Sequence, residues 1–302
     1  MTVNAAGAAT DGCAKNTPLQ RVDLHTHSTC SDGQWTPTDL VAEAARVGIG
    51  ALALTDHDTV AGLEEFLSAG RSYGIWTIPA IEVSAALGDR PLHVLCYGVD
   101  PESPCWQELA AAREEGREEM YRLLFRQLRE QGYRLEEEAA RDGDGRLVAH
   151  PLESALRKAG HPDPAGETRR LFRPFILPVL YLRSISVERL ARVIEGEKLL
   201  CAIAHPGREE AGVSVRLSDR DLERILAVLP LRALEAYHPM HTSAERDGVL
   251  ALARKYGLLV TCGSDAHGHR VGRPPIGYSA DLCEQFLREM RESPLVKTGA
   301  IW

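Results

Sequence analysis

The sequence contains no apolar run that approaches the roughly 20 residues needed to cross a bilayer. Its first roughly 17 residues are rich in Ala and Gly and lack the basic start and long apolar stretch of a signal peptide. The 7 cysteines include no CxxC pair, and an odd number is a poor basis for a disulfide framework. We therefore expect a cytoplasmic protein with reduced thiols, no membrane contact and a flexible N-terminal extension over residues 1–20.

An excess of positive charge is also absent. The chain carries 35 Lys and Arg against 43 Asp and Glu, which gives a net charge of −8. Broad electrostatic attraction to nucleic acid is not indicated, so any contact with a phosphate must be local. The length of 302 residues, without an apparent internal repeat, suits one α/β barrel with an insertion, or two ordinary domains.

From residue 21 onward, short apolar runs alternate with helical patterns. Each run ends where Val, Leu, Ile and Ala give way to His, Asp or Glu, as in RVDLHTH, ALALTDH and LLVTCGSDAH. Such runs are typical of buried strands, and their alternation with helices is typical of a parallel α/β sheet. Helices are predicted over residues 36–47, 60–73, 187–195, 217–228, 243–256 and 281–291, the first with Thr36 as N-cap and Pro37 at its first position.

One connection is too short for this alternation. Between Val83 and Leu92 there is no room for the dozen or more residues of a parallel crossover, so we expect a hairpin through residues 87–89. In a hairpin the end of one strand lies beside the start of the next. Glu82 and His93 are therefore predicted to reach the same rim of the barrel.

After the hairpin the strand–helix alternation is interrupted. A long charged helix is predicted over residues 104–131, and the proline-rich segment that follows, up to about residue 184, lacks the alternation. We interpret residues 111–184 as a mostly helical insertion that caps the rim. The barrel itself is then formed by residues 21–110 and 185–302.

Imidazole and carboxylate side chains follow most of the predicted strands. Gathered at the carboxyl ends of parallel strands, such side chains are how an α/β barrel builds a metal site. A mixture without thiolate favours Mn²⁺, Fe²⁺ or Zn²⁺ at a hydrolytic site, and two or three ions with Glu82 as a bridge would use the whole set. The nine candidate ligands are His25, His27, Asp32, His57, Glu82, His93, His205, Asp265 and His267.

Each candidate has a simpler interpretation when it is taken alone. A single His at a strand end is more often a hydrogen-bonding residue than a metal ligand. Asp32 and Asp56 also suit N-caps or turns. It is the joint occurrence of nine such residues at one rim that favours a metal cluster.

Seven short motifs occur in the order found in PHP-domain metal-dependent phosphoesterases, which this chain resembles. They are DLHTHS, CSDG, TDHD, EVS, HVLCYG, AHPG and GSDAHG, between residues 23 and 268. The resemblance implies an α/β fold, a distorted seven-stranded (β/α) barrel, with two or three ions, usually manganese. It implies one ion held by His25, His27, Glu82 and Asp265, a second by Glu82, His93 and His205, and a third by Asp32, His57 and His267.

The insertion between the fourth and fifth strands resembles the TrpH-related branch of this family. That branch includes 3′,5′-nucleoside bisphosphate phosphatases and RNase AM-type 5′-to-3′ exonucleases, in which a Gly-Arg-x-His segment binds phosphate. The corresponding residues here, 145–151, have a longer spacing between Arg146 and His150. Further candidates for holding a phosphate are Arg208 and Arg273, whose planar forks suit bidentate contact, and the basic run at residues 169–173.

Metal chemistry predicts the reaction. A metal-bound hydroxide would attack phosphorus in line while the ions neutralise the phosphoryl oxygens. His238, which ends the ALEAY run at the same rim, is the candidate general acid for the leaving oxygen. A purely hydrogen-bonding role suits its position equally well.

We therefore expect a phosphomonoesterase for small nucleotides with 3′ and 5′ phosphates, such as 3′-phosphoadenosine 5′-phosphate, or for the 5′ end of short single-stranded RNA. One alternative is a phosphatase for another small metabolite, such as histidinol phosphate. A second is a non-catalytic PHP module that binds nucleotide, which would have lost ligands. The acidic net charge speaks against long duplexes, and the oligomeric state is left open.

Overall fold

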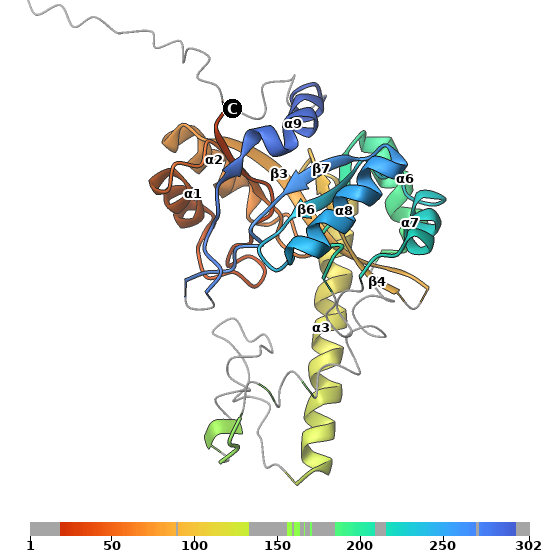
Figure 1. Cartoon of the computed structure of the whole chain (residues 1–302). Coiled ribbons are helices and arrows are strands. Elements are labelled where there is room, and N and C mark those ends of the chain that lie inside the picture. The colour runs from red at the N-terminus through yellow and green to blue at the C-terminus, as the bar shows by residue number, and fades with distance from the viewer. Residues whose placement is uncertain are drawn as a thin grey trace, which may run out of the picture.

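Eight strands form one mixed sheet that curls into a barrel (Figure 1). The computed structural model describes residues 19–88, 90–132, 156–158, 160–163, 166, 170, 185–208, 216–269 and 272–293. The strand order is β7-β6-β5-β4-β3-β2-β1-β8. Neighbours pair in parallel except where β4 meets β3 and β5 and where β8 meets β1. The strands are β1 Arg21–Asp23, β2 Ala51–Leu54, β3 Trp76–Leu87, β4 Arg90–Tyr97, β5 Leu200–Ile203, β6 Ala233–Tyr237, β7 Leu259–Cys262 and β8 Tyr278–Ser279.

The barrel is joined just beyond β1 and β7. The backbone N–H of Leu24 donates to the Cys262 carbonyl at 3.1 Å, and that of Asp265 donates to the His25 carbonyl at 2.8 Å. The predicted distorted barrel is confirmed, with eight strands rather than seven. The additional strand, β8, has 2 residues and pairs with the start of β1. So short a segment has no periodicity of its own, which is why the prediction missed it.

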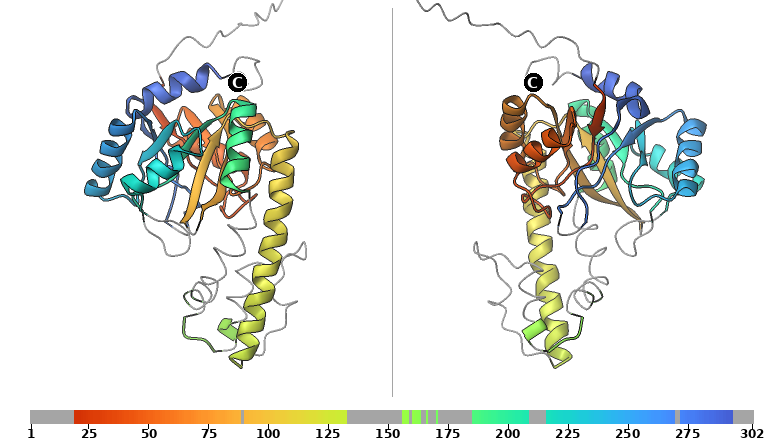
Figure 2. Two further views of the ribbon diagram at one scale, coloured as in Figure 1. Left: turned by 90° about the vertical axis from the view of Figure 1, so that its right-hand side faces the viewer. Right: turned by 60° about the vertical axis from the view of Figure 1, so that its left-hand side comes forward.

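Helices of the strand–helix alternation lie outside the sheet (Figures 1 and 2). The predicted N-cap is confirmed, since the Thr36 side chain accepts the Asp39 backbone N–H at 3.1 Å. The second helix begins at Leu63 rather than at residue 60, because the backbone first makes a turn in which Leu63 N–H donates to Val60 O. The helices are α1 Pro37–Arg46, α2 Leu63–Tyr73, α6 Val187–Glu197, α7 Asp219–Leu226, α8 Ser243–Tyr256 and α9 Glu284–Arg291, the last preceded by a 3₁₀ turn over Ala280–Cys283.

The longest helix, α3 (Pro104–Glu130), begins against the barrel and extends well beyond it (Figure 2). Near its start Trp106 is buried in the core, and Glu197 at the end of α6 accepts hydrogen bonds from Ser103 Oγ and Trp106 Nε1. The helix predicted over residues 104–131 is therefore confirmed. Most of the predicted insertion over residues 111–184 lies outside the described residues, so its role as a cap and the domain division stay predictions.

The predicted hairpin joins β3 to β4. Ser84 pairs with His93 and Leu87 with Arg90. Since β2 pairs only with the first part of β3, as far as Pro79, the rest of β3 continues past the end of β2. Glu82 lies in this continuation, so the hairpin brings Glu82 and His93 to the rim where β1, β2, β5 and β7 end.

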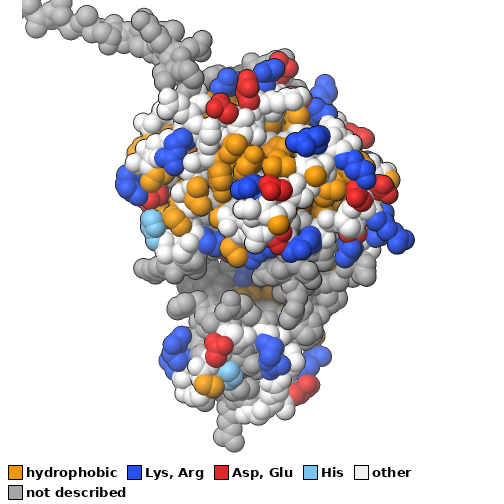
Figure 3. Space-filling model, viewed as in Figure 1, with side chains coloured by type: hydrophobic (Ala, Val, Ile, Leu, Met, Phe, Trp, Pro, Cys, Tyr) orange, Lys and Arg blue, Asp and Glu red, His pale blue; other side chains and the backbone are white. Residues whose placement is uncertain are grey.

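Charged side chains of both signs are interspersed over the face of the molecule in Figure 3. On that face the Lys and Arg side chains of the described residues are mixed with Asp and Glu rather than joined into one continuous basic track. None of the helices in the described part of the chain combines the length and hydropathy that a bilayer-spanning segment needs.

Candidate metal centre

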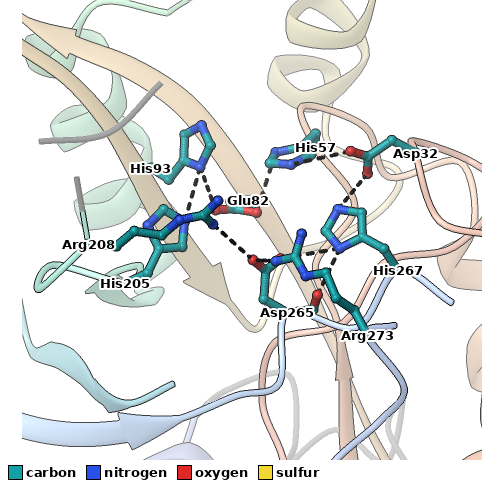
Figure 4. Close-up of a pocket in the computed structure, with 9 residues that line it drawn as sticks. All are labelled: Asp32, His57, Glu82, His93, His205, Arg208, Asp265, His267 and Arg273. Carbon is teal, nitrogen blue, oxygen red and sulfur yellow. Dashed lines mark hydrogen bonds and ion pairs between the residues drawn. The ribbon is translucent and has the colours of Figure 1, made fainter. Parts of the chain in front are cut away.

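The nine polar side chains predicted to share a rim converge at one end of the barrel; Figure 4 shows seven of them. Their backbone positions are the ends of β1, β2, β5 and β7, the loop after β1, and the β3–β4 hairpin. Asp32 is exposed and His57 half-buried, whereas the other seven are buried. Tertiary structure thus gathers residues that are as much as 242 positions apart, from His25 to His267 (267 − 25 = 242).

Four of these residues, His25, His27, Glu82 and Asp265, form a compact group. Glu82 Oε2 lies 3.0 Å from His25 Nε2 and 3.2 Å from His27 Nε2. Asp265 Oδ1 lies 3.5 and 3.2 Å from the same nitrogens, which are 3.1 Å apart. By simple geometry, ligands about 2.1 Å from one ion are separated by about 3.0 Å in an octahedral and about 3.4 Å in a tetrahedral shell. The group therefore has the edge lengths of a coordination shell.

The other oxygen of Glu82 faces a second group. Glu82 Oε1 lies 2.8 Å from His93 Nδ1 and 3.3 Å from His205 Nε2, and those two nitrogens are 3.3 Å apart. His57 Nδ1 approaches Glu82 Oε2 at 3.3 Å. One carboxylate thus lies close to five imidazoles, which is the position of a bridging ligand.

A third group surrounds Asp32. Its Oδ1 lies 3.1 Å from His267 Nε2 and 3.8 Å from His27 Nδ1, and its Oδ2 lies 4.0 Å from His57 Nε2. The short distances between donor atoms define three groups that match the three ligand sets implied by the family resemblance, with two additions. His27 also belongs to the Asp32 group, and His57 also faces Glu82. Which ion each residue holds stays a prediction.

The donor atoms suit divalent metal ions. All are imidazole nitrogens or carboxylate oxygens, the ligand types of Mn²⁺, Fe²⁺ and Zn²⁺ sites. Burial lowers the pKa values of His57, His205 and His267, that of His205 to about 3, so these rings are neutral and keep a lone pair for a cation. The Nδ1 atoms of His27 and His205 are buried without a hydrogen-bond partner among the described residues. The clusters are consistent with a polynuclear divalent metal site.

Two of the nine residues have left-handed backbone conformations. His205 has φ 33° and Asp265 has φ 53°. Outside glycine such conformations cost about 1–3 kcal/mol each and persist only where the surroundings hold them. Nearby, Gly263 has no room for a side chain, because a Cβ there would lie 2.2 Å from His25 Cβ. Tight local packing therefore fixes the turns that carry these side chains.

Three buried carboxylates accept hydrogen bonds from the segments that carry the candidate ligands. Asp56 accepts hydrogen bonds from the Ser28 backbone N–H at 2.7 Å and from the Ser28 hydroxyl at 2.6 Å. Asp23 accepts the Ser264 N–H at 2.9 Å, and Glu235 contacts two of the nine candidates. The sequence indicates Asp56 only as a cap or turn residue, and the roles of Asp23 and Glu235 were not predicted. Each of these two lies within an apolar run, and an isolated acid in a buried strand is the signal that would have identified them.

A cavity of about 180 Å³ lies over the three groups, and two predicted phosphate contacts line it (Figure 4). Arg208 Nη1 is 3.7 Å from Asp265 Oδ2, and Arg273 forms an ion pair with the same oxygen. The other two predicted contacts, Arg146 and His150, lie outside the described residues. Of the arginines in the basic run at residues 169–173, Arg170 alone is described, and it is exposed.

The predicted general acid, His238, lies beside Asp265. Its Nε2 is 3.4 Å from Asp265 Oδ2, and its Nδ1 accepts the Met240 backbone N–H at 3.2 Å. Burial lowers the pKa of His238 to about 3, so the ring is neutral at neutral pH. Because Nδ1 is the acceptor, Nε2 carries the proton and donates toward Asp265. His238 does not line the cavity.

Comparisons with known proteins agree on one family. The model of the PHP domain matches residues 23–167. A phosphoribosyl 1,2-cyclic phosphate 1,2-diphosphodiesterase of Eggerthella lenta is 33% identical over 84% of this chain and 96% of its own length. A 3′,5′-nucleoside bisphosphate phosphatase of Chromobacterium violaceum is 29% identical over 90% of this chain and 97% of its own. The 5′-3′ exoribonuclease Rnm of Salmonella typhimurium is 28% identical over 81% of this chain and 84% of its own.

Solved structures show the same architecture. A Chromobacterium violaceum protein described as an amidohydrolase with bound sulfate superimposes with a TM-score of 0.72. It is 26% identical, and the match covers 90% of this chain and 96% of that one. The similarity therefore extends over the barrel and beyond it.

Proposed function

The chain belongs to the PHP family of metal-dependent phosphoesterases, and from this premise we propose that it hydrolyses a phosphate ester on a ribose that carries a second phosphoryl group. A nucleoside 3′,5′-bisphosphate such as 3′-phosphoadenosine 5′-phosphate is the leading substrate, and the 5′ end of a short RNA is a further one. The observation that carries this proposal is the cavity itself, where two arginines border three groups of metal-ligand type.

The names of the relatives share one chemical feature, which supports this choice. A nucleoside 3′,5′-bisphosphate and a phosphoribosyl cyclic phosphate each place two phosphoryl groups on one ribose, and each ribose inside an RNA chain also carries two. An enzyme that acts on such molecules must contact one phosphoryl group at the reacting centre and the other outside it. We take this pair of phosphoryl groups as the element recognised by this chain.

The residues we propose as ligands are the nine predicted from the sequence, for two or three divalent ions. Imidazole and carboxylate donors suit Mn²⁺, Fe²⁺ and Zn²⁺, and among these we propose Mn²⁺ because it is the usual ion in the family that the chain resembles. Glu82 lies between the first two groups, and His27 and His57 adjoin the third. When bound, such ions supply Lewis acidity toward phosphoryl oxygens and lower the pKa of coordinated water.

Two arginine side chains at the cavity support a proposal for binding the substrate's negative charge. We propose that Arg208 and Arg273, which line the cavity beside Asp265, donate hydrogen bonds to the oxygens of the reacting phosphoryl group. A guanidinium neutralises the charge that builds on those oxygens as the ester breaks. The general-acid role of His238 stays a prediction, and its contact with Asp265 supports a role in holding that carboxylate.

A second candidate is hydrolysis of a cyclic phosphodiester of phosphoribose. It is favoured by the 33% identity to the Eggerthella lenta diphosphodiesterase over nearly the whole length of that protein. Histidinol phosphate has no second phosphoryl group and no support from these relatives. A non-catalytic module would have lost ligands, whereas every one of the nine positions is filled here.

The test is hydrolysis by Mn²⁺-loaded protein of a panel of four compounds: 3′-phosphoadenosine 5′-phosphate, 5′-AMP, phosphoribosyl 1,2-cyclic phosphate and histidinol phosphate. The reaction is followed by ³¹P NMR, because opening a cyclic phosphodiester leaves a phosphomonoester and releases no inorganic phosphate. The proposal requires that kcat/KM for the bisphosphate exceed that for 5′-AMP by at least about 100-fold, as expected when a second charged contact is lost. Preference for the cyclic compound would support the second candidate. Equal rates on 5′-AMP and the bisphosphate would refute recognition of a second phosphoryl group.

A further inference from the structure

A second, larger cavity adjoins the metal centre. Its volume is about 550 Å³, and Asp32 and His57 line both this cavity and the one over the metal groups. The remaining walls are the loop after β1, the loop after β2 and the first half of α3, from which Ala110 and Arg113 reach the cavity. We call this cavity the α3 pocket.

The sizes of the two cavities suggest a division of roles. The smaller one, about 180 Å³, has room for ions and one phosphoryl group. Pockets for whole small ligands usually measure about 300–1,000 Å³, and the α3 pocket falls in this range. The body of a substrate whose phosphate sits over Asp32 and His57 therefore has an adjoining space to enter.

The walls of the α3 pocket carry hydrogen-bonding groups suited to a sugar. Thr29, Ser31 and Thr59 contribute hydroxyl-bearing side chains, and Arg113 contributes a guanidinium. Arg117 adds a second guanidinium, which pairs with Glu114 in the same wall. Arg113 Nε lies 3.2 Å from Asp58 Oδ2, while its Nη1 is buried without a hydrogen-bond partner among the described residues. Nη1 itself is closed off from the cavity, and the ion pair with Asp58 holds the guanidinium in the pocket wall.

We propose that the α3 pocket holds the part of the substrate beyond the reacting phosphoryl group, that is, the nucleoside with its second phosphoryl group. This rests on the proposed function and adds the location of the substrate body. Ala110 faces the pocket from α3 and is not one of the nine candidate ligands, so a large side chain there takes up space in the pocket and leaves every ligand residue in the sequence.

The experiment compares Ala110→Trp with Ala111→Trp, its exposed neighbour on the same helix that does not line the pocket. Each Mn²⁺-loaded variant is assayed on 3′-phosphoadenosine 5′-phosphate and on p-nitrophenyl phosphate, whose body is a single small ring. Ala110→Trp should raise KM for the bisphosphate by at least about 10-fold and leave kcat/KM for the small ester within about 3-fold of wild type. Ala111→Trp should change neither, and Ala110→Leu should show a smaller version of the same selectivity.

The outcomes separate the two proposals. A wild-type protein that hydrolyses the small ester and not the bisphosphate refutes the proposed function, and the pocket assignment with it. Normal wild-type turnover of the bisphosphate, unchanged in Ala110→Trp, refutes the pocket alone. Equal losses on both esters in a folded Ala110→Trp protein also contradict the assignment, because they show no selectivity for the substrate body.

An independent observation concerns Glu235 in β6. Its side chain is fully buried and contacts two candidate ligands that belong to different groups. Glu235 Oε1 accepts from His25 Nδ1 at 3.0 Å, and Oε2 accepts the His205 backbone N–H at 2.7 Å. The second bond holds the turn in which His205 has φ 33°.

The first of these bonds decides which nitrogen of His25 can bind a metal. A proton on Nδ1, donated to Glu235, leaves the lone pair on Nε2, and Nε2 faces Glu82 and Asp265. We infer that Glu235 is a positioning residue that sets the His25 tautomer and holds the His205 turn. Glu235 acts through the His25 side chain and the His205 backbone, and it touches no substrate.

The substitution Glu235→Gln tests this inference because glutamine has only one acceptor oxygen. If that oxygen accepts the His205 N–H, the amide NH₂ faces His25 Nδ1, and the proton moves to Nε2, where it blocks metal binding. If instead the oxygen accepts from His25, the His205 N–H loses its partner, at a cost of about 1–3 kcal/mol. Either arrangement disturbs one candidate ligand.

The measurement is zinc stoichiometry together with ¹⁵N NMR of histidine side chains in Zn²⁺-loaded protein. Glu235→Gln should bind about one ion fewer than wild type, and the His25 or His205 signals should lose their metal-bound shifts. The control is Glu197→Gln, which changes a carboxylate that accepts two hydrogen bonds from Ser103 and Trp106. Full zinc stoichiometry and wild-type shifts in Glu235→Gln would overturn the inference, whereas loss of zinc in both variants would point to general destabilisation and would also contradict it.

Discussion

Arg113 of α3 reaches across to the buried carboxylate of Asp58, with 3.2 Å between Nε and Oδ2. The other oxygen of Asp58 accepts the Ser84 backbone N–H at 2.6 Å. Asp58 also has a left-handed backbone, with φ 52°. This ion pair therefore ties the long helix to the loop that carries His57 and to β3, which carries Glu82.

Replacement of Arg113 by methionine should destabilise the fold, because it leaves the buried Asp58 carboxylate without its cation. Breaking a buried pair costs about 3–5 kcal/mol, and we expect about 1–3 kcal/mol here because the Arg113 side chain is 24% exposed. Urea unfolding measures this loss. Adding Asp58→Asn to Arg113→Met should recover part of it, and a double variant that is less stable than both single variants would contradict the ion-pair explanation.

Glu82→Gln should remove more than one ion. The carboxylate contacts the imidazoles of two groups through different oxygens, at 3.0 Å from His25 and 2.8 Å from His93. An amide nitrogen in place of one oxygen repels a cation, so that kcat/KM should fall by more than about 100-fold. Metal analysis of the purified protein is the direct readout, with Glu284→Gln as the control because Glu284 is exposed and pairs with Arg288 on the surface of α9. Wild-type metal content in Glu82→Gln would exclude a bridging role.

Arg273→Met should weaken substrate binding more than metal binding. The guanidinium lines the cavity and pairs with Asp265, so its loss removes a charge-assisted contact to a phosphoryl oxygen. Such contacts contribute about 1.5–3 kcal/mol, which corresponds to a rise of about 10- to 150-fold in KM. Steady-state kinetics measures the rise, and Mn²⁺ content should stay that of wild type. A variant that loses its metal and keeps its KM would assign Arg273 to the metal site.

Much of this site could be predicted because strand ends are visible in the sequence. The change from apolar residues to His or Asp marks the end of a buried strand, and the short link between Val83 and Leu92 indicates the hairpin. Since the ends of parallel strands meet at one edge, a shared rim for His25, His57 and His205 follows without coordinates. The helix caps were equally local, as at Thr36.

The parts that escaped prediction depend on distant contacts. β8 has 2 residues and forms only because β1 lies beside it. Glu235 lies in an apolar run, and its partner His25 is 210 positions away. The pairing of Arg113 with Asp58 depends on where α3 crosses the barrel, which no local pattern encodes. Such contacts form only in the folded chain, so no local sequence pattern predicts them.

The ion pair between Arg90 of β4 and Asp221 of α7 should make the stability of the fold depend on pH. Arg90 makes a bidentate contact with Asp221, with distances of 3.0 and 2.8 Å to Oδ1 and 2.7 Å to Oδ2. Burial alone would raise the pKa of Asp221, but the hydrogen bonds from Ser218 and Arg90 hold it below the ordinary value of 3.8. The charged form is therefore favoured in the folded state, and its stabilisation is complete above pH 3.8 and lost as pH falls through the lower folded-state pKa.

Asp221→Asn should accordingly lower the free energy of unfolding by about 1–2 kcal/mol at pH 7, through loss of the charge-assisted bonds. Thermal unfolding of both proteins from pH 7 down to pH 3 measures the difference. The difference in free energy of unfolding between wild type and variant should be constant down to about pH 4 and should become smaller below that pH. A gap that narrows on raising the pH would contradict the assigned direction of the pKa shift.

Gly263→Ala should damage the metal centre through packing alone. A Cβ at this position would lie 2.2 Å from His25 Cβ and 2.6 Å from Glu235 Oε1, so His25 or the turn to Asp265 must move. Overpacking of this kind costs about 1–3 kcal/mol, and displacement of His25 should reduce zinc stoichiometry as well as stability. The control is Gly196→Ala in α6, where an added Cβ meets nothing within 4 Å. This substitution should raise the free energy of unfolding by about 0.5–1 kcal/mol, because alanine favours the helix. Normal zinc binding by a destabilised Gly263→Ala protein would show that the turn relaxes without moving His25, and would separate the packing of this strand end from the metal site.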